Sequence, residues 1–201
     1  MKGSLIILGF FLSGVLLGRL DIIPRADQAG DLASWALYML LFVVGMGIGF
    51  DTRSFRILRE LHVKVALVPL FVGIGTLGGS LAAWALLGDM PLRDVFGVGA
   101  GFGYYSLSSI MITKMGDAAL GSMALIANIS RELVTLLAAP LLVRLFGGLA
   151  PVMAGGATSM DTSLPIIARY AGERYGIIAV FSGMVLTVAV PILVTAIFTW
   201  L

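Results

Sequence analysis

Long, uninterrupted runs of apolar residues, separated by short polar stretches, dominate the chain. Because a helix needs about 20 apolar residues to cross the hydrocarbon of a bilayer, each run is long enough to span a membrane. The runs are continuous, whereas strands of a transmembrane β-barrel alternate apolar and polar residues. The pattern therefore predicts an all-α fold, a polytopic membrane helix bundle of about seven spanning segments, over residues 3–20, 32–50, 65–88, 95–113, 118–146, 151–171 and 174–200.

Composition supports a membrane protein. Hydrophobic residues make up 59% of the 201 residues and charged residues 12%, against about 45–50% and 25% in soluble domains. The mean hydropathy is +1.05. A soluble chain of this length could not bury so much apolar surface. Since the predicted spans leave little chain for loops, we expect residues 1–201 to form a single transmembrane domain.

Several classes of function are excluded by the residues that the chain lacks. It has no cysteine and one histidine, which rules out disulfide frameworks, cysteine metal sites and a histidine-rich site within the chain. The motifs of zinc proteases and of α/β-hydrolases are also absent. A net charge of +2 does not indicate a nucleic-acid partner. We therefore expect no enzyme activity, no metal and no other cofactor.

Basic residues predict the orientation in the membrane. The loop over residues 51–64 carries the densest cluster, Arg53, Arg56, Arg59 and Lys64. Because cytoplasmic loops are enriched in Lys and Arg, this loop is expected in the cytoplasm. Seven crossings would then place the N-terminus in the cytoplasm and the C-terminus outside.

A glycine-rich stretch interrupts the fourth run. Glycines alternate over residues 97–103, and each one disfavours a helix by about 1 kcal/mol relative to alanine. Such glycines either allow close helix packing or mark an unwound backbone that offers carbonyls and hydroxyls to a ligand. The second alternative makes Tyr105, Ser106 and Ser108 candidate binding residues.

Charged residues interrupt the run over 118–146. Asn128, Arg131, Glu132 and Thr135 follow i, i+3, i+4, i+7 spacing and share one helix face. A central Arg or Glu facing lipid costs at least ~2.5–3.5 kcal/mol, so this face should look toward protein or a water-filled cavity. The charges then serve either a structural ion pair with another helix or a binding site.

A carboxylate surrounded by hydroxyls interrupts the run over 151–171. Glycines precede Asp161 and Pro165 follows it, a pattern that predicts a discontinuous helix. Irregular backbone at membrane depth is tolerated where it lines a cavity or is buried in protein. The alternative is a capping cluster near the interface. The candidate binding residues are Gly156, Thr158, Ser159, Asp161, Thr162 and Ser163.

At these interruptions the chain resembles the LysO-type lysine exporters of prokaryotic inner membranes, from about residue 32 to the C-terminus. The resemblance is carried by Gly101–Ser108, by Arg131-Glu132-Leu133, and by Gly156–Asp161 followed by Leu164-Pro165. It implies a multi-pass inner-membrane protein that exports L-lysine and close analogues such as thialysine, and an important role for Asp161.

The chain departs from the longer single-chain members of that family, which carry additional N-terminal helices with their own functional acidic residue. The resemblance therefore suggests that a small companion membrane subunit, or a second copy of this chain in a homo-oligomer, completes the transporter. Membrane lipids would surround it.

The charge of lysine suggests a mechanism. Moving one positive charge outward against an inside-negative potential costs about 2.3 kcal/mol per 100 mV, so export needs a coupling ion. A buried carboxylate at Asp161, aided by Glu132, could exchange a proton for the lysine ammonium; sodium is the alternative ion. Arg131, or a half-helix N-terminus near Gly156, would hold the substrate carboxylate. Further hydroxyl contacts would come from Ser106, Ser108, Thr158 and Ser159.

Two other functions fit the sequence. The chain could be a sodium- or proton-coupled carrier of another small solute, with the hydroxyl-rich motif holding the ion. It could also be a non-transporting subunit of a membrane complex, whose polar residues serve assembly.

Overall fold

The computed structural model describes residues 63–201 continuously and, before them, only scattered helical positions: 13, 14, 16, 17, 19, 35, 39, 42 and 46. The chain divides into two compact units, Met1–Gly47 and Ile48–Leu201. The predicted spans 3–20 and 32–50 lie largely outside the described residues, as does the basic loop up to residue 62. The fold is therefore described here for residues 63–201.

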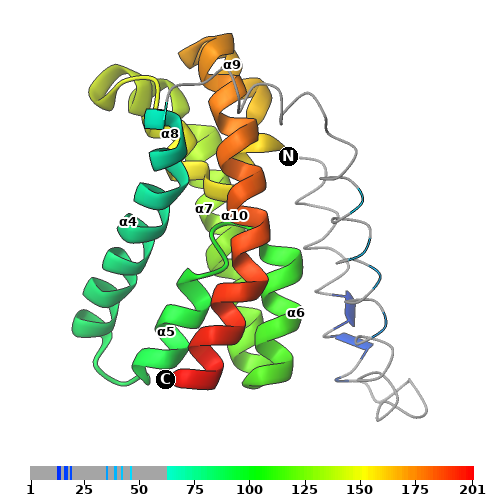
Figure 1. The fold of residues 1–201 in the computed structure, drawn as a ribbon. Helices are drawn as coiled ribbons and strands as arrows, with labels where there is room; N and C mark the ends of the chain where they lie inside the picture. The colour runs from blue at the N-terminus through cyan, green and yellow to red at the C-terminus, as the bar shows by residue number, and fades with distance from the viewer. Residues whose placement is uncertain are drawn as a thin grey trace. The chain divides into compact units, whose positions relative to one another are not determined.

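Three long helices form the frame of this unit (Figure 1). They are α4 (Val63–Leu87), α7 (Ala118–Phe146) and α10 (Glu173–Trp200). Each contains a stretch long and apolar enough to cross a membrane. The helices begin and end close to the predicted spans, which confirms these three predictions as continuous helices.

A first helical hairpin replaces the predicted crossing over 95–113. Helix α5 (Leu92–Gly99) is followed by a tight turn and by α6 (Tyr105–Met115). Phe102 and Gly103 adopt positive φ angles of 45° and 97° in the turn, so the chain reverses its direction. A helix of eight residues is only about 12 Å long, too short to cross the hydrocarbon.

Both ends of this hairpin lie near the end of α10. The Arg93 guanidinium stands 5.2 Å from the centre of the Phe198 ring. At the other end of the hairpin, a Cβ added to Gly116 would lie 3.3 Å from the same ring. The chain therefore enters and leaves at one end of the bundle, and the expectation of a full crossing over 95–113 is wrong.

A second hairpin replaces the predicted crossing over 151–171. It consists of α8 (Ala150–Gly155), the 3₁₀ helix η2 (Gly156–Met160) and α9 (Leu164–Ala171). The helix is broken at Gly156, where φ is 61°. The sequence predicts a discontinuous helix here, but it does not predict that the two halves run in opposite directions.

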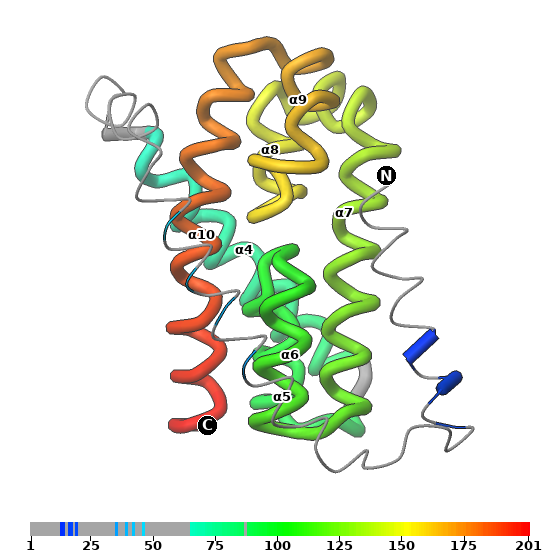
Figure 2. Tube along the Cα trace, turned by 90° about the vertical axis from the view of Figure 1, so that its right-hand side faces the viewer, coloured from blue at the N-terminus to red at the C-terminus, as the bar shows by residue number. Residues whose placement is uncertain are grey.

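The ends of the second hairpin lie near the start of α10. A Cβ on Gly148, just before α8, would contact the Tyr175 ring, and one on Gly176 would lie 3.5 Å from Ala168 in α9. The expectation of a full crossing over 151–171 is therefore also wrong. Figure 2 shows the two hairpins approaching each other from opposite ends, beside α7 and α10.

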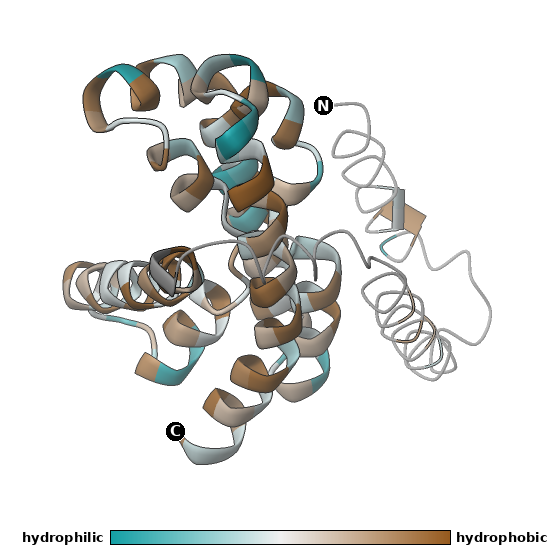
Figure 3. Ribbon diagram, turned by 45° about the horizontal axis from the view of Figure 1, so that its top comes forward, coloured by the Kyte–Doolittle hydropathy of each residue, from teal (hydrophilic) through white to brown (hydrophobic). Residues whose placement is uncertain are grey.

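The core of the described unit lies between the hairpins and the long helices. Phe102, Leu107, Ile112, Ile167 and Leu186 are fully or almost fully buried. Apolar residues also predominate along the outer helices (Figure 3), where large side chains such as Leu137 and Ile192 are exposed. The described residues are helical without strands, which confirms the all-α class.

Candidate functional site

The tips of the two hairpins touch through their backbones. The Ala157 N–H donates to the Phe102 carbonyl over 2.8 Å. A Cβ on Gly103 would lie 2.9 Å from the Gly155 carbonyl, and one on Gly156 would overlap the Phe102 carbonyl. Glycine is required at these positions because the two chains approach so closely.

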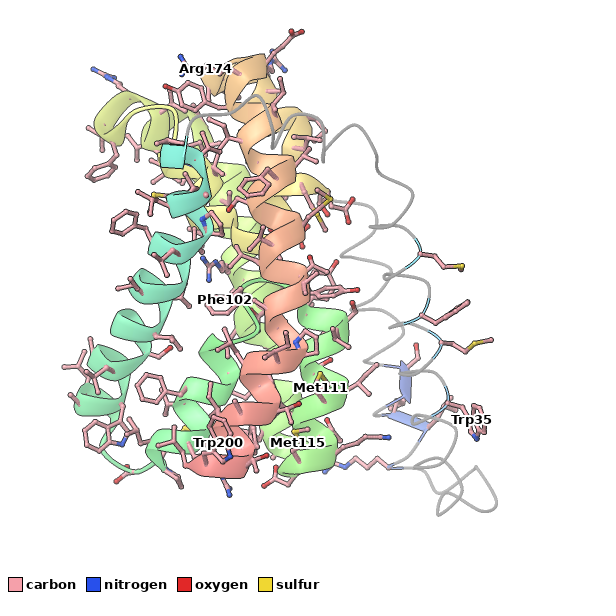
Figure 4. The ribbon with its side chains drawn as sticks, viewed as in Figure 1. Trp35, Phe102, Met111, Met115, Arg174 and Trp200 are labelled. Atoms are coloured by element: carbon pink, nitrogen blue, oxygen red, sulfur yellow. The ribbon has the colours of Figure 1, made fainter. Side chains whose placement is uncertain are left out.

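The point of contact lies far from both ends of α10. Met160, at the end of η2, packs against Gly183, which is about 15 Å along the helix from its first residue. Figure 4 shows Phe102 in the middle of the bundle, between Arg174 at one end and Trp200 at the other. The tips therefore meet at the depth expected for the interior of a membrane.

Asn128 of α7 holds the first tip. Its side-chain oxygen accepts from the Gly103 N–H over 2.7 Å, and its Nδ2 donates to the carbonyls of Val98 (3.3 Å) and Ala124 (2.8 Å). The residue is only 4% exposed. Asn128 thus fastens the tip to α7, a structural role beside the binding role that the sequence suggests.

Arg131 of α7 holds the second tip. Its Nε and Nη2 donate to the carbonyls of Ala154 (2.7 Å) and Met153 (3.0 Å), and its Nη1 donates to the Thr76 hydroxyl (3.1 Å) on α4. These carbonyls belong to the last turn of α8, where a helix attracts cations. The backbone just before Gly156 is therefore the C-terminus of α8, and η2 begins directly after it. That the start of η2 holds the substrate carboxylate stays a prediction.

Glu132 is the buried carboxylate of the site. Its side chain is 0% exposed, and Thr135, on the same face, is also 0% exposed. The prediction that this face of α7 looks toward protein is thereby confirmed. Asn128 reaches the first tip, and Thr135 lies next to Gly155 in the second. Glu132, between them on α7, lies at the depth where the tips meet.

Asp161 is less buried than expected. It follows η2 in the turn to α9, and its N–H donates to the Thr158 carbonyl over 3.1 Å. The residue is exposed, so the expectation of a buried carboxylate at this position is wrong for the described structure. The turn carries the Asp161 side chain outward, and the buried carboxylate is Glu132 instead.

Tyr104 brings the first tip close to Asp161. The charge of the Asp161 carboxylate acts on the Tyr104 phenol. Tyr104 lies directly before α6, beside the candidates Tyr105 and Ser106, yet the sequence analysis did not select it. Only the contact between the two hairpins reveals its proximity to Asp161.

The candidate hydroxyls fall into two groups. The Thr158 and Ser159 hydroxyls donate to the carbonyls of Gly155 (2.9 Å) and Gly156 (2.6 Å), so they stabilise the second tip. By contrast, buried hydroxyl oxygens without a hydrogen-bond partner among the described residues are found at Ser108, Ser163, Ser182 and Thr187. Ser182 and Thr187 on α10 were missed by the sequence analysis, because they lie singly in an apolar run. Tyr105, Ser106 and Thr162 are partly exposed.

A cleft of about 350 Å³ opens between α4, α5 and α7. Its polar lining consists of Arg131 and Asn128 on α7 and of Thr76 and Ser80 on α4; the rest is glycine, alanine, valine and methionine. The sequence analysis missed both α4 residues. Asp161 and Glu132 are not among the residues that line this cleft.

Metal ligands do not cluster in the described part of the chain. Over residues 63–201 and the scattered earlier positions, no group of three or more His, Asp or Glu side chains could hold a metal ion. The chemistry available at the hairpin tips is therefore that of carboxylates, hydroxyls, backbone carbonyls and one guanidinium.

Comparisons with known proteins identify the family. A family model described as the lysine exporter LysO matches residues 8–198. The lysine exporter LysO of Escherichia coli (strain K12) is 31% identical over 193 residues, which cover 95% of this chain and 61% of that protein. The "Putative lysine exporter" of Haemophilus influenzae is 30% identical over 159 residues, 79% of this chain and 80% of that protein. This chain therefore spans less than two thirds of the length of the Escherichia coli relative.

No solved structure gives a significant match. The family match covers almost the whole sequence and confirms the resemblance carried by the motifs around Ser106, Arg131 and Asp161. The chain belongs to the LysO family of lysine exporters.

Proposed function

We propose that this chain is a secondary active transporter that exports L-lysine, and close analogues such as thialysine, across the prokaryotic inner membrane. Residues 1–201 would act as a single transport domain. Membership in the lysine exporter family supports the substrate. The observation that carries the mechanism is the fully buried Glu132, at the depth where two broken helices meet. An ionisable residue inside a membrane marks a functional site by default.

Export proceeds by exchange with protons. Because lysine is a cation, moving it outward alone costs about 2.3 kcal/mol per 100 mV, whereas exchange for one proton is electroneutral. Asp161, which is exposed, receives the lysine ammonium. Glu132, which is enclosed, carries the exchanged proton. Lysine leaves Asp161 on the outside, and the proton leaves Glu132 on the inside.

The candidate hydroxyls have two roles, contact with the substrate or ion and stabilisation of the second tip. Ser106 and Ser108 near the first tip, and Ser163 after the second, offer oxygens to the substrate or the ion. Thr158 and Ser159 keep the second tip in shape through their bonds to backbone carbonyls.

The exposure of Asp161 suggests that the transporter contains a further protein subunit. An exposed carboxylate at the depth of the hairpin tips cannot face lipid without a large cost. Water or protein must therefore cover it, and a second copy of the chain or a small companion membrane subunit would supply protein there. The working transporter is then a homo-oligomer or a complex with that subunit.

The basic residues support an orientation with the start of α10 in the cytoplasm. Arg144, Arg169 and Arg174 lie near that end, whereas Arg93 and Lys114 lie near the other. The excess at the first end favours its cytoplasmic location. The C-terminus is then outside. Two further spans before α4, which the sequence predicts over 3–20 and 32–50, would put the N-terminus in the cytoplasm.

Flux measurements test this function directly. Purified protein in liposomes loaded with labelled lysine should release the label faster when a proton gradient is imposed across the membrane. A sodium gradient of the same size should have no effect. Absence of lysine flux with the chain alone, and also with a small membrane protein encoded beside it, would contradict the proposal.

A sodium-coupled carrier is the second candidate. The buried oxygens of Ser108 and Ser163, which have no hydrogen-bond partner in the described part of the chain, favour it, because hydroxyl and carboxylate oxygens are suitable ligands for a hard cation. Strict dependence on sodium in the same liposomes, without stimulation by lysine, would identify this function instead.

A further inference from the structure

The guanidinium of Arg131 has no anionic partner among the described residues. Its hydrogen bonds go to two backbone carbonyls and one hydroxyl, all of them neutral. A charge removed from water costs several kcal/mol unless an opposite charge compensates it. An arginine in the middle of a long apolar helix therefore points to an anion that is absent from the described chain.

The same guanidinium lines the cleft between α4, α5 and α7. A guanidinium carries five N–H donors, and the bonds described above leave donors free on Nη1 and Nη2. Thr76, Ser80 and Asn128 add polar groups to an otherwise apolar wall. Ligand sites commonly have this composition, a mostly apolar pocket with a few converging polar groups.

Charge and size define what the cleft can hold. No Asp or Glu lines it, so Arg131 is the charged residue on its wall and no acidic side chain there would repel an anion. Its volume of about 350 Å³ lies at the lower end of the range for small-molecule sites, which is about 300–1,000 Å³. A small anion fits better than a large one, and the planar guanidinium fork matches a carboxylate in particular.

We propose that this cleft is the subsite for the α-carboxylate of the transported amino acid, with Arg131 as its anion-binding residue and Thr76 as the residue that positions it. This inference rests on the proposed function, since lysine supplies the carboxylate. Arg131 and Glu132 are consecutive on α7, so α7 would present a receptor for the anionic end of the substrate beside the acidic residue that carries the exchanged proton.

Two adjacent glycines of α4 provide a matched test. Gly79 lines the cleft and Gly78 does not. A Cβ added at either position meets no atom of the described residues within 4 Å. Gly79→Leu should therefore fill the cleft without disturbing the fold, and Gly78→Leu should add the same side chain outside it. We expect lysine export in liposomes to fall by about tenfold or more in Gly79→Leu and to change by less than about twofold in Gly78→Leu.

A substrate without the carboxylate tests the role of Arg131. Lysinamide keeps both amino groups of lysine but has no anionic end. The wild-type protein should export lysine about tenfold or more faster than lysinamide. The ratio of the two rates should fall toward one in Arg131→Gln and should fall in part in Thr76→Val, which removes the hydroxyl bonded to Nη1. A ratio measured within one preparation does not depend on how much protein folds.

The outcomes separate this inference from the proposed function. If the wild type exports lysine but Gly79→Leu behaves like Gly78→Leu, the carboxylate subsite is not in this cleft. If the ratio of the lysine and lysinamide export rates is unchanged in both Arg131→Gln and Thr76→Val, Arg131 does not bind the substrate carboxylate and serves only to hold the second tip. If the wild type exports no lysine under any gradient, the proposed function fails and the subsite falls with it.

Discussion

The N–H of Ala157 donates a hydrogen bond of 2.8 Å to the carbonyl of Phe102, and this bond joins the tips of two hairpins that enter the bundle from opposite ends. The residues on either side are held by different side chains of α7, Asn128 for the first tip and Arg131 for the second. The geometry of the candidate site therefore depends on backbone contacts that tolerate little change.

Gly156→Ala should separate the tips. The added Cβ would overlap the Phe102 carbonyl, and the φ of 61° at this position is unfavourable for alanine. We expect a loss of about 1–3 kcal/mol in stability, seen as a lower midpoint of thermal unfolding in detergent. Gly75→Ala is the control, because a Cβ at this position in α4 meets no atom of the described residues within 4 Å, so the change should be neutral or stabilising. Equal midpoints for the two variants would contradict the close contact of the tips.

Glu132→Gln should uncouple export from the proton gradient. The substitution keeps the size of a fully buried side chain but removes the group that exchanges a proton. Lysine efflux from liposomes should fall by about tenfold or more, and the residual flux should no longer respond to an imposed pH difference. Glu173→Gln, at the exposed start of α10, should retain the wild-type response. A pH-dependent flux in Glu132→Gln would assign the proton to another group.

Asp161→Asn should abolish export while leaving the protein in the membrane at its normal level. An exposed side chain contributes little to folding, so the loss would reflect the missing charge for the lysine ammonium. Asp89→Asn, in the exposed connection between α4 and α5, is the matched control. Undiminished lysine export by Asp161→Asn would remove this residue from the site.

Asn128→Leu should destabilise the first tip. The change leaves the buried Gly103 N–H without its acceptor, and an unsatisfied buried donor costs about 1–3 kcal/mol. Thermal unfolding in detergent measures the loss. Ser122→Ala, which removes a hydroxyl bonded to the Ala118 carbonyl of the same helix, should have a much smaller effect. A wild-type midpoint for Asn128→Leu would show that α7 does not hold the tip.

Cysteine labelling can test the re-entrant path of the second hairpin. Because the chain has no cysteine, single replacements can be labelled without background. Leu149→Cys and Tyr170→Cys lie at the two ends of the hairpin and are exposed. An impermeant thiol reagent should reach both from the cytoplasmic side and should reach Thr199→Cys from the outside. Labelling of Leu149→Cys and Tyr170→Cys from opposite sides would contradict the re-entrant path and show that residues 151–171 cross the membrane.

The long helices could be predicted from sequence and the hairpins could not, for a physical reason. Hydropathy reports whether a segment is apolar and long enough to span, and the runs over 95–113 and 151–171 meet both conditions. Hydropathy does not report whether the chain crosses the membrane within such a segment or turns back to the side from which it entered. The reversal at Gly103 and the break at Gly156 depend on positive φ angles and on backbone contact between segments distant in sequence.

The candidate site was predicted in part. Periodicity was sufficient to place Asn128, Glu132 and Thr135 on a protein-facing side of α7, since no charged face of a central helix can look at lipid. It was not sufficient to show which carboxylate is buried, because the orientation of Asp161 is decided by the turn between η2 and α9. Thr76 of α4 accepts a hydrogen bond from Arg131. Because Thr76 lies in an ordinary apolar run, nothing in the sequence indicates this contact.

The shortness of the hairpin helices has a consequence for biogenesis. Helices of eight residues or fewer, such as α5 and α8, cannot be released into lipid as independent spans, since their tips would expose unsatisfied backbone groups there. The groups that satisfy them, Asn128 and Arg131, are on α7, which is synthesised after the first hairpin and before the second. The nascent first hairpin must therefore wait at the insertion machinery or the membrane surface until α7 is laid down, whereas the second finds its receptor already in place.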